Sequence, residues 1–399
     1  MTRRNEPLQP VLIEHQKELD QLVVQCAADG RFAFDTEFVM EDRYESEVCL
    51  IQVALESSVA IIDPFLKLDL GAFWALIAND RVEKVVHAGQ EDLAISVQNT
   101  SLAPRRVFDT QLASGLVGPD YPLSLQRLVQ MMLHVRLHKS KTLTDWRKRP
   151  LTAEQISYAS EDVSYLLAVH QKLHDRLAQK KRLAWALEEF GHFEDLTLYR
   201  RAEEDRLLRI KGAGSLRGQE LIILQALFRY RDEFARRVNR PARVILKDHL
   251  MIEIARQGMT KFADIRDLRG INLNDREVQN VCKVVSDALA VPQRDWPQSK
   301  PSEVEAPWEA SVLALATGVI RAYCLDHDLA YSLAATQKSI RELVRFRTGS
   351  IKIQPGEIEL LHGWRGLTVG KLLDEVLDGS RGVRVRVDKT GGELRLEAD

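Results

Sequence analysis

Three acidic motifs stand in apolar segments, where a folded chain does not ordinarily place charge. The first is Phe34-Asp35-Thr36-Glu37-Phe38, in which Asp35 and Glu37 are two residues apart on a predicted strand and therefore share one face. Two carboxylates crowded in apolar surroundings repel each other unless a cation or protons compensate. The pair indicates a metal-binding or proton-sharing site, although Asp35 could also be a plain strand-end residue and Glu37 a solvated one.

The second and third motifs lie further along the chain. In Val85-Val86-His87-Ala88-Gly89-Gln90-Glu91-Asp92 a strand ends, glycine allows a tight turn, and Asp92 falls in the first turn of a helix. In Tyr158-Ala159-Ser160-Glu161-Asp162 the end residues are four apart, on one helical face. Alone, Asp92 is a favourable first-turn acid and the Tyr158/Asp162 pair is a common surface arrangement. Together, four acids would suit two hard divalent cations, which can drive phosphodiester hydrolysis.

These motifs make the chain resemble ribonuclease D, in the tyrosine-bearing (DEDDy) branch of the DEDD 3′→5′ exonuclease superfamily. The resemblance spans roughly residues 8–200. Besides the acidic motifs it includes Leu50-Ile51-Gln52, Lys139-Ser140, Asp145-Trp146 and Arg149-Pro150-Leu151. Two positions depart from the family pattern, Tyr44-Glu45-Ser46 in place of Tyr-Pro and His138 in place of Asp, and neither is a metal ligand.

The resemblance implies a fold, a site and a reaction. The fold would be a ribonuclease-H-like mixed sheet. Asp35, Glu37, Asp92 and Asp162 would bind two divalent metal ions, Mg²⁺ or Mn²⁺, and Tyr158 would position the attacking water. The products would be 5′-mononucleotides released from the 3′ end of an RNA, with tRNA precursors as the usual substrates. His87 is either a structural imidazole or a catalytic one, and the structural role is favoured because Tyr158 already positions the water.

The elements that must hold these residues alternate between strand and helix patterns. Strands are predicted at Phe32–Asp35, Cys49–Leu55, Val59–Asp63, Val82–His87 and Val107–Phe108. Helices are predicted at Leu68–Ala78 and Gln90–Gln98, with helical periodicity from Leu123 onward. Thr152 with Gln155 matches a capping box, and Asp109 is predicted to cap a helix that follows its strand. The pattern predicts a mixed α/β sheet.

The chain divides into four predicted parts. Residues 1–205 form the exonuclease domain, residues 212–290 resemble the helical HRDC domain, and residues 291–308 are a proline-rich linker. Residues 309–399 are predicted to be a second, degenerate HRDC-like domain that closes with a hairpin, Val383–Val387 and Glu393–Leu396. The fold expected is therefore the mixed-sheet domain followed by two mainly α-helical HRDC-type domains.

Basic residues indicate where RNA could be held. Residues 1–200 carry 23 Lys and Arg against 29 Asp and Glu, a net charge of −6, whereas residues 201–290 carry 18 against 13, a net charge of +5. A solvated surface is the plain alternative for each basic side chain, and a sheet-face hydrogen bond is the alternative for Gln52. The residues predicted to contact RNA are Gln52, Lys139, Lys141, Arg147, Arg149, Arg236, Arg240 and Lys247.

Composition excludes several classes of protein. The 399 residues are 45% hydrophobic and 29% charged, which excludes a disordered chain or a small disulfide scaffold. The stretch Ala310–Ile320 is far shorter than the ~18–20 residues of a membrane span, and the first thirty residues lack a secretory signal. We expect a monomeric cytoplasmic enzyme that needs no protein partner and acts on RNA with a free 3′ end. A DNA 3′→5′ exonuclease and a non-catalytic nucleic-acid scaffold are the alternatives.

Overall fold

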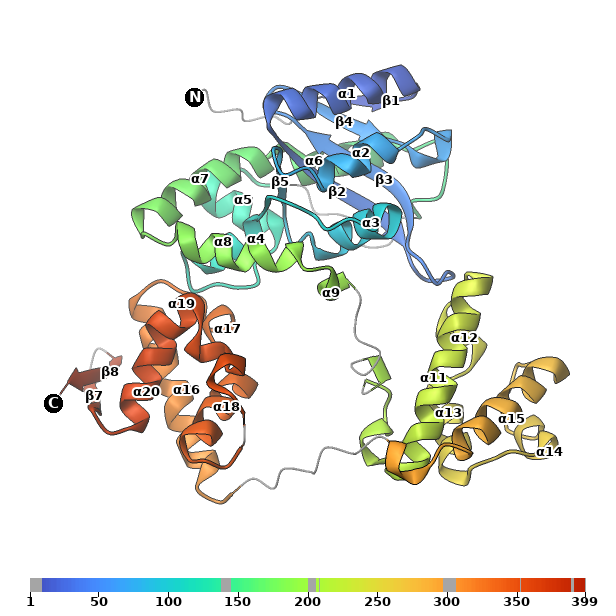
Figure 1. Cartoon of the computed structure of the whole chain (residues 1–399). Coiled ribbons are helices and arrows are strands. Elements are labelled where there is room, and N and C mark those ends of the chain that lie inside the picture. The colour runs from blue at the N-terminus through green and yellow to red at the C-terminus, as the bar shows by residue number, and fades with distance from the viewer. Residues whose placement is uncertain are drawn as a thin grey trace. The chain divides into compact units, whose positions relative to one another are not determined.

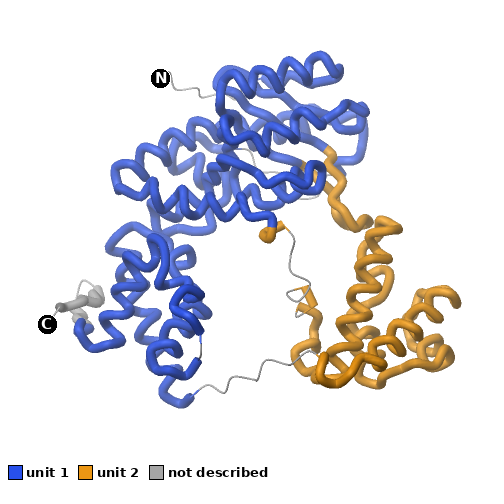
Figure 2. Tube along the Cα trace, in the orientation of Figure 1, with its two compact units in different colours: residues 1–36, 50–196, 304–399 blue, residues 37–49, 197–303 orange. Residues whose placement is uncertain are grey.

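The computed structural model describes residues 9–137, 145–199, 206–207, 209–296, 306–351, 353–388 and 391–398. Their contacts form two compact units (Figure 2). The first comprises residues 1–36, 50–196 and 304–399, and the second comprises residues 37–49 and 197–303. Lys139 and Lys141, two of the predicted RNA contacts, lie outside the described residues, as does the middle of the predicted linker.

A six-stranded mixed sheet forms the centre of the exonuclease region, as predicted (Figure 1). In the order β1-β4-β3-β2-β5-β6, its strands are β1 Pro10–Ile13, β4 Val59–Ile62, β3 Glu47–Ala54, β2 Arg31–Val39, β5 Glu83–Val86 and β6 Val107–Asp109. The β3–β4 pair is the predicted antiparallel hairpin, whereas β1–β4, β2–β5 and β5–β6 are parallel. The five predicted strands are observed, and β1 was not predicted.

Helices pack against this sheet and enclose its apolar side chains (Figure 1). Phe32 and Phe34 of β2 contact Phe73 with ring centroids 6.2 and 6.4 Å apart, and all three are almost fully buried. This aromatic cluster anchors the strand that carries the first acidic motif. The helices are α1 Gln16–Asp29, α2 Gly71–Ile77, α3 Gln90–Thr100, α4 Thr110–Gly115, α5 Leu125–Leu133, α6 Ala153–Ser164, α7 Leu166–Gln179 and α8 Leu183–Gly191. The short helix α9 Leu196–Tyr199 follows, and residues 197–199 of it belong to the second unit.

The C-terminal helices belong to the same unit as the sheet. Arg182 joins the two parts because its guanidinium donates to the carbonyl oxygens of Leu116, His327 and Asp328 at 2.6–3.0 Å. The helices are α16 Glu309–Asp326, α17 Tyr331–Ala334, α18 Gln337–Arg347, α19 Gly363–Arg365 and α20 Lys371–Leu377. The predicted hairpin is confirmed as β7 Arg381–Asp388 and β8 Gly391–Ala398, whereas the likeness of this part to HRDC stays a prediction.

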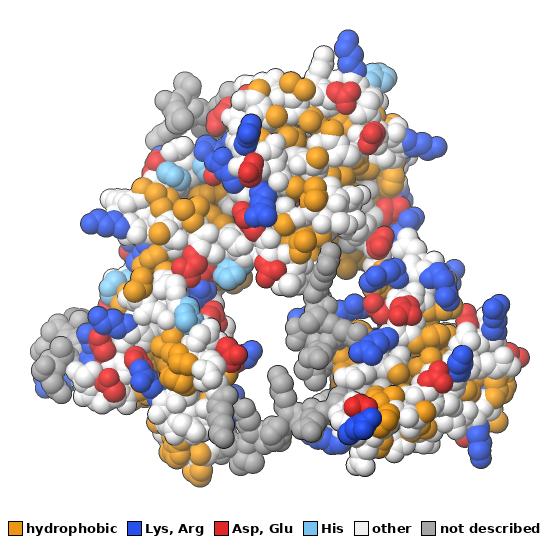
Figure 3. Space-filling model, viewed as in Figure 1, with side chains coloured by type: hydrophobic (Ala, Val, Ile, Leu, Met, Phe, Trp, Pro, Cys, Tyr) orange, Lys and Arg blue, Asp and Glu red, His pale blue; other side chains and the backbone are white. Residues whose placement is uncertain are grey.

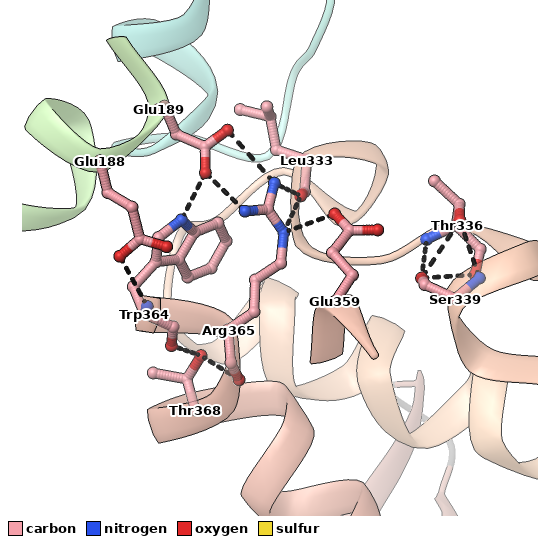
Figure 4. Close-up of polar contacts among 9 residues, drawn as sticks. All are labelled: Glu188, Glu189, Leu333, Thr336, Ser339, Glu359, Trp364, Arg365 and Thr368. Carbon is pink, nitrogen blue, oxygen red and sulfur yellow. Dashed lines mark hydrogen bonds and ion pairs between the residues drawn. The ribbon is translucent and has the colours of Figure 1, made fainter. Parts of the chain in front are cut away.

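A buried ion pair lies where these C-terminal helices meet α8 (Figure 4). The carboxylate of Glu189 accepts from the Arg365 guanidinium at 2.5 and 3.2 Å and from the Trp364 indole N–H at 2.6 Å. The indole of Trp364 also stacks on Trp185 with centroids 4.9 Å apart. A charged pair with its hydrogen bonds satisfied fixes the relative placement of the two surfaces that it joins.

The second unit is helical over residues 218–289, as predicted, and residues 37–49 add to it the end of β2 and the start of β3. Its helices are α11 Gly218–Val238, α12 Ala242–Ile245, α13 Asp248–Gln257, α14 Phe262–Arg266 and α15 Asp275–Leu289. Leu224, Ile254 and Val281 are among the fully buried residues of its core. Tyr44, from the segment between β2 and β3, belongs to this unit because its hydroxyl donates to Asp232 at 2.8 Å.

Candidate active site

The first acidic motif lies on β2. Asp35 and Glu37 are half-buried, and Thr36 between them is buried, as the alternation of a strand requires. The Thr36 hydroxyl donates a hydrogen bond to the carboxylate of Asp92. This bond joins β2 to the first turn of α3, so that the first and second motifs lie side by side.

Asp92 is a buried acid whose charged form is disfavoured. Its side chain is 7% exposed, and burial raises its pKa to about 6, although the Thr36 hydroxyl and backbone N–H groups act in the opposite direction. The nearby carboxylate of Asp109 also raises the pKa of Asp92. A cation beside Asp92 would favour the ionised carboxylate and lower this pKa.

Asp162 and Tyr158 lie one turn apart on α6, which begins with the predicted capping box of Thr152 and Gln155. Asp162 is 9% exposed, and burial raises its pKa to about 7. A hydrogen bond from the Tyr158 hydroxyl lowers this pKa, and the neighbouring Glu161 raises it. The helix therefore presents a phenol and a carboxyl group that titrates near neutral pH.

The segment before α6 supports Tyr158. The ring of Trp146, which is buried, lies 6.0 Å from the ring of Tyr158. Arg149 donates from Nη1 to the Trp146 carbonyl at 2.8 Å and pairs with both carboxylate oxygens of Asp63 at 2.5 and 2.8 Å. Its guanidinium also covers the ring of Phe65 at 4.7 Å. Arg149 thus holds this segment to the chain after β4, and the RNA contact predicted for it stays a prediction.

The acids fit divalent cations by the chemistry of their donors. Carboxylate oxygens are the hard ligands that Mg²⁺ and Mn²⁺ take, and Asp92 and Asp162 are buried with no basic side chain, among the residues that the structure describes, that shifts their pKa values. Among the described residues, there is no cluster of three or more His, Cys, Asp or Glu side chains that could hold a metal ion. The structure pairs Asp92 with Thr36 and Asp162 with Tyr158 instead.

The predicted RNA contacts differ in their accessibility. Gln52 lies on β3 with 0% exposure, and neither polar atom of its amide has a partner among the described residues. Arg147 is exposed, and so are the three residues predicted in the second unit, Arg236, Arg240 and Lys247. Lys and Arg side chains protrude over much of the face of that unit shown in Figure 3, with Asp and Glu among them. These contacts stay predictions.

Two further polar residues, His87 and Asp109, lie at the second motif. His87 contacts the Thr110 hydroxyl through Nδ1 at 3.0 Å and the Leu123 carbonyl through Nε2 at 3.1 Å, as a structural imidazole would. Asp109 caps α4, as predicted, by accepting from the N–H groups of Gln111 and Leu112. It also contacts the turn before α3, which the sequence pattern did not indicate because that turn lies about twenty residues earlier in the chain.

Comparison with known proteins places this arrangement in context. The family model of a 3′-5′ exonuclease matches residues 10–178, and that of the HRDC domain matches residues 220–279. The chain is 31% identical to ribonuclease D of Gluconacetobacter diazotrophicus over 92% of each chain, and 30% identical to ribonuclease D of Shewanella sp. over 89% of this chain and 90% of that one. The crystal structure of Escherichia coli RNase D covers 93% of this chain with a TM-score of 0.81 and 26% identity, and 99% of that chain is matched. In the described part of the chain, every helix is too short or too polar to cross a membrane.

Proposed function

The chain belongs to the ribonuclease D family and is a 3′→5′ exoribonuclease, and we propose that it hydrolyses RNA one nucleotide at a time, releasing 5′-mononucleotides. The observation that supports this proposal is the bond from Thr36 to Asp92, which joins the strand that carries Asp35 and Glu37 to the first turn of α3. Asp35 and Glu37 flank that threonine on the same strand.

We propose that Asp35, Glu37, Asp92 and Asp162 hold two divalent cations, Mg²⁺ or Mn²⁺. Such ions, when bound, supply Lewis acidity that makes water a stronger nucleophile and stabilises charge on the leaving oxygen. The contribution of the chain is to present anionic oxygens in a site that largely excludes water, since Asp92 and Asp162 are almost fully buried. Low polarity around these groups strengthens every charge interaction with them.

Tyr158 is proposed to position the attacking water and to assist its deprotonation. Its hydroxyl is already oriented by the Asp162 carboxylate one turn away, and its ring packs beside Trp146. Because the hydroxyl and the ring of Tyr158 are both already held, the side chain loses little conformational entropy when it orients a water. Catalysis by positioning depends on such a low entropic cost. The contacts of Arg149 accordingly support a role in holding the segment before α6.

The proposed substrates are structured RNAs with a free 3′ end, such as tRNA precursors. The relative from Escherichia coli is described as an exoribonuclease involved in structured RNA processing. A net charge of +5 over residues 201–290 would attract the phosphate backbone to the HRDC domain. The proposal includes action as a cytoplasmic monomer without an obligatory protein partner.

Substrate choice and polarity are tested by matched nucleic acids. The purified chain is incubated with Mg²⁺ and a 5′-labelled tRNA precursor, the same RNA with a blocked 3′ hydroxyl, or DNA of the same sequence. The expected result is stepwise shortening of the open RNA, little change in the blocked RNA and slower loss of the DNA. Equal or faster loss of DNA would favour a DNA exonuclease, and cleavage of the blocked RNA would contradict attack from the 3′ end.

A further inference from the structure

Asp109 is a buried carboxylate that accepts hydrogen bonds from two separate segments. It ends β6, is 2% exposed and lies beside Val86 in the parallel β5–β6 register. Its Oδ1 accepts from the N–H groups of Gln111 at 2.7 Å and Leu112 at 3.2 Å, which is an ordinary helix cap. In addition, Ala88 donates to Oδ1 at 3.2 Å and Gly89 donates to Oδ2 at 3.0 Å.

The turn that donates these additional bonds has a conformation that needs support. Ala88 has φ +54°, in the left-handed region that a residue with a Cβ atom seldom adopts. At Gly89 a Cβ would lie 2.5 Å from the Cβ of Val86, so the turn is pressed against the end of β5. Two hydrogen bonds to one buried carboxylate therefore fix a turn in which Ala88 has a backbone shape that it does not itself favour.

The same turn determines where α3 begins. Gly89 is the residue at the N-terminal cap of α3, and its carbonyl accepts from the Leu93 N–H at 3.0 Å. Asp92 is the third residue of this helix, within the turn that this bond closes, and it is fixed at its other end by Thr36. A shift or rotation of the turn would consequently move the carboxylate of Asp92 relative to β2.

We propose that Asp109 is a positioning residue for metal binding: it fixes the turn at residues 87–89 and, through the first turn of α3, holds Asp92 against Thr36 of β2, the strand that carries Asp35 and Glu37. This inference rests on the proposed role of Asp92 as a metal ligand. Residues that orient a ligand without touching the metal change metal affinity or activity by about 10- to 100-fold when they are replaced.

The variant Asp109→Ser separates the two sets of bonds. Serine is a good helix cap and can accept from the N–H groups at Gln111 and Leu112, but its shorter side chain cannot also reach the turn at Ala88 and Gly89. A residue that acts as a helix cap alone would be replaced by serine with little loss. A residue that positions Asp92 would not.

The variant Asp109→Asn tests whether loss of the Asp109 carboxylate weakens or strengthens metal binding. Asparagine keeps the shape of the side chain, but its amide N–H group must face either the N–H of Gly89, at the position of Oδ2, or the three N–H groups that Oδ1 accepts. Removal of the negative charge beside Asp92 would, by electrostatics alone, favour the ionised Asp92 and strengthen metal binding. The positioning role predicts weaker binding, so the two explanations differ in direction.

The experiment measures Mn²⁺ binding to the full-length apo protein by electron paramagnetic resonance, together with kcat and KM on a labelled RNA. For Asp109→Ser and Asp109→Asn we expect the Kd for Mn²⁺ to rise, and kcat to fall, by about tenfold or more, with KM changed by less than about threefold. Val169→Ala, a buried core change on α7, is the control for lost stability: it should lower the melting temperature without changing Mn²⁺ affinity.

Folded Asp109→Ser protein with wild-type Mn²⁺ affinity and kcat would overturn the inference. Should the serine variant fail to fold, the asparagine variant decides, and unchanged or tighter Mn²⁺ binding by it would also overturn the inference. Asp92→Ala distinguishes failure of the proposed function: if it binds Mn²⁺ as well as the wild type, the ligand role of Asp92 is wrong. If Asp92→Ala loses Mn²⁺ and both Asp109 variants keep it, the ligand role stands and the positioning role is wrong.

Discussion

Replacement of Asp162 by asparagine should stabilise the metal-free protein at alkaline pH while it abolishes activity. Burial raises the pKa of Asp162 to about 7, against about 3.8 for an unfolded aspartic acid. Between these values the folded state binds more protons than the unfolded state, so stability falls as pH rises from about 4 to about 7. The neutral asparagine keeps the shape of the side chain, can accept the same hydrogen bond from Tyr158, and has no charge to desolvate.

The size of the stability difference between Asp162→Asn and the wild type follows from the raised pKa of Asp162. One pKa unit corresponds to about 1.4 kcal/mol, so a rise from 3.8 to about 7 corresponds to about 4 kcal/mol of lost stability above pH 8, as an upper bound. The pKa of Asp92 rises to about 6, which adds about 3 kcal/mol in the same direction and is shared by the wild type and the variant. The gap between Asp162→Asn and the wild type should therefore open from near zero at pH 4 to about 2–4 kcal/mol at pH 8.

Urea unfolding in EDTA, repeated from pH 4.5 to pH 8.5, measures this gap. Asp175→Asn, a change at an exposed acid on α7, is the matched control and should follow the wild-type curve at every pH. With excess Mg²⁺ the gap should shrink or reverse, because binding to the folded wild type restores its stability and the variant has lost a ligand. Parallel pH curves for Asp162→Asn and the wild type in EDTA would refute the reasoning.

Three further substitutions test separate contacts. Tyr158→Phe should lower kcat by about 100-fold while Mn²⁺ affinity is retained, and loss of Mn²⁺ binding would contradict a role in positioning water. Arg149→Lys cannot reproduce the paired bonds to Asp63, so single-turnover cleavage should slow by about tenfold with RNA affinity unchanged; a change in RNA affinity alone would favour the predicted RNA contact. Glu189→Gln removes the buried carboxylate that pairs with Arg365 and leaves the half-exposed carboxylate of Glu359 at 3.2 Å, so urea unfolding should show a loss of about 1–3 kcal/mol, whereas an unchanged free energy of unfolding would contradict this.

Local patterns predicted the elements that carry the acidic motifs. The short apolar run at Phe32–Asp35 became β2, the β3–β4 hairpin formed across its predicted turn, and the capping box at Thr152 began α6. Each of these signals depends on residues within a few positions of one another, through side-chain alternation or a cap bond. The relation of Tyr158 to Asp162 was predictable for the same reason.

Contacts between distant segments were not predictable from the sequence. Strand β1, Pro10–Ile13, has four residues, and it is defined by its parallel pairing with β4, about fifty residues later. Arg149 was predicted to contact RNA, and the sequence does not reveal its pairing with Asp63, 86 residues away. The bond between Arg365 and Glu189 spans 176 residues. Periodicity reports which face of an element is apolar, but it does not identify the partner of a charge.

The most direct test of the two-metal account follows one labelled RNA through three conditions. A 5′-labelled tRNA precursor is incubated with the wild type in Mg²⁺, with the wild type in EDTA, and with Asp35→Ala or Asp162→Ala in Mg²⁺, with Asp175→Ala as the control for an exposed acid. The account predicts stepwise shortening from the 3′ end by the wild type and by Asp175→Ala in Mg²⁺, and intact RNA in the other reactions. Shortening that persists in EDTA, or in either active-site variant, would contradict it.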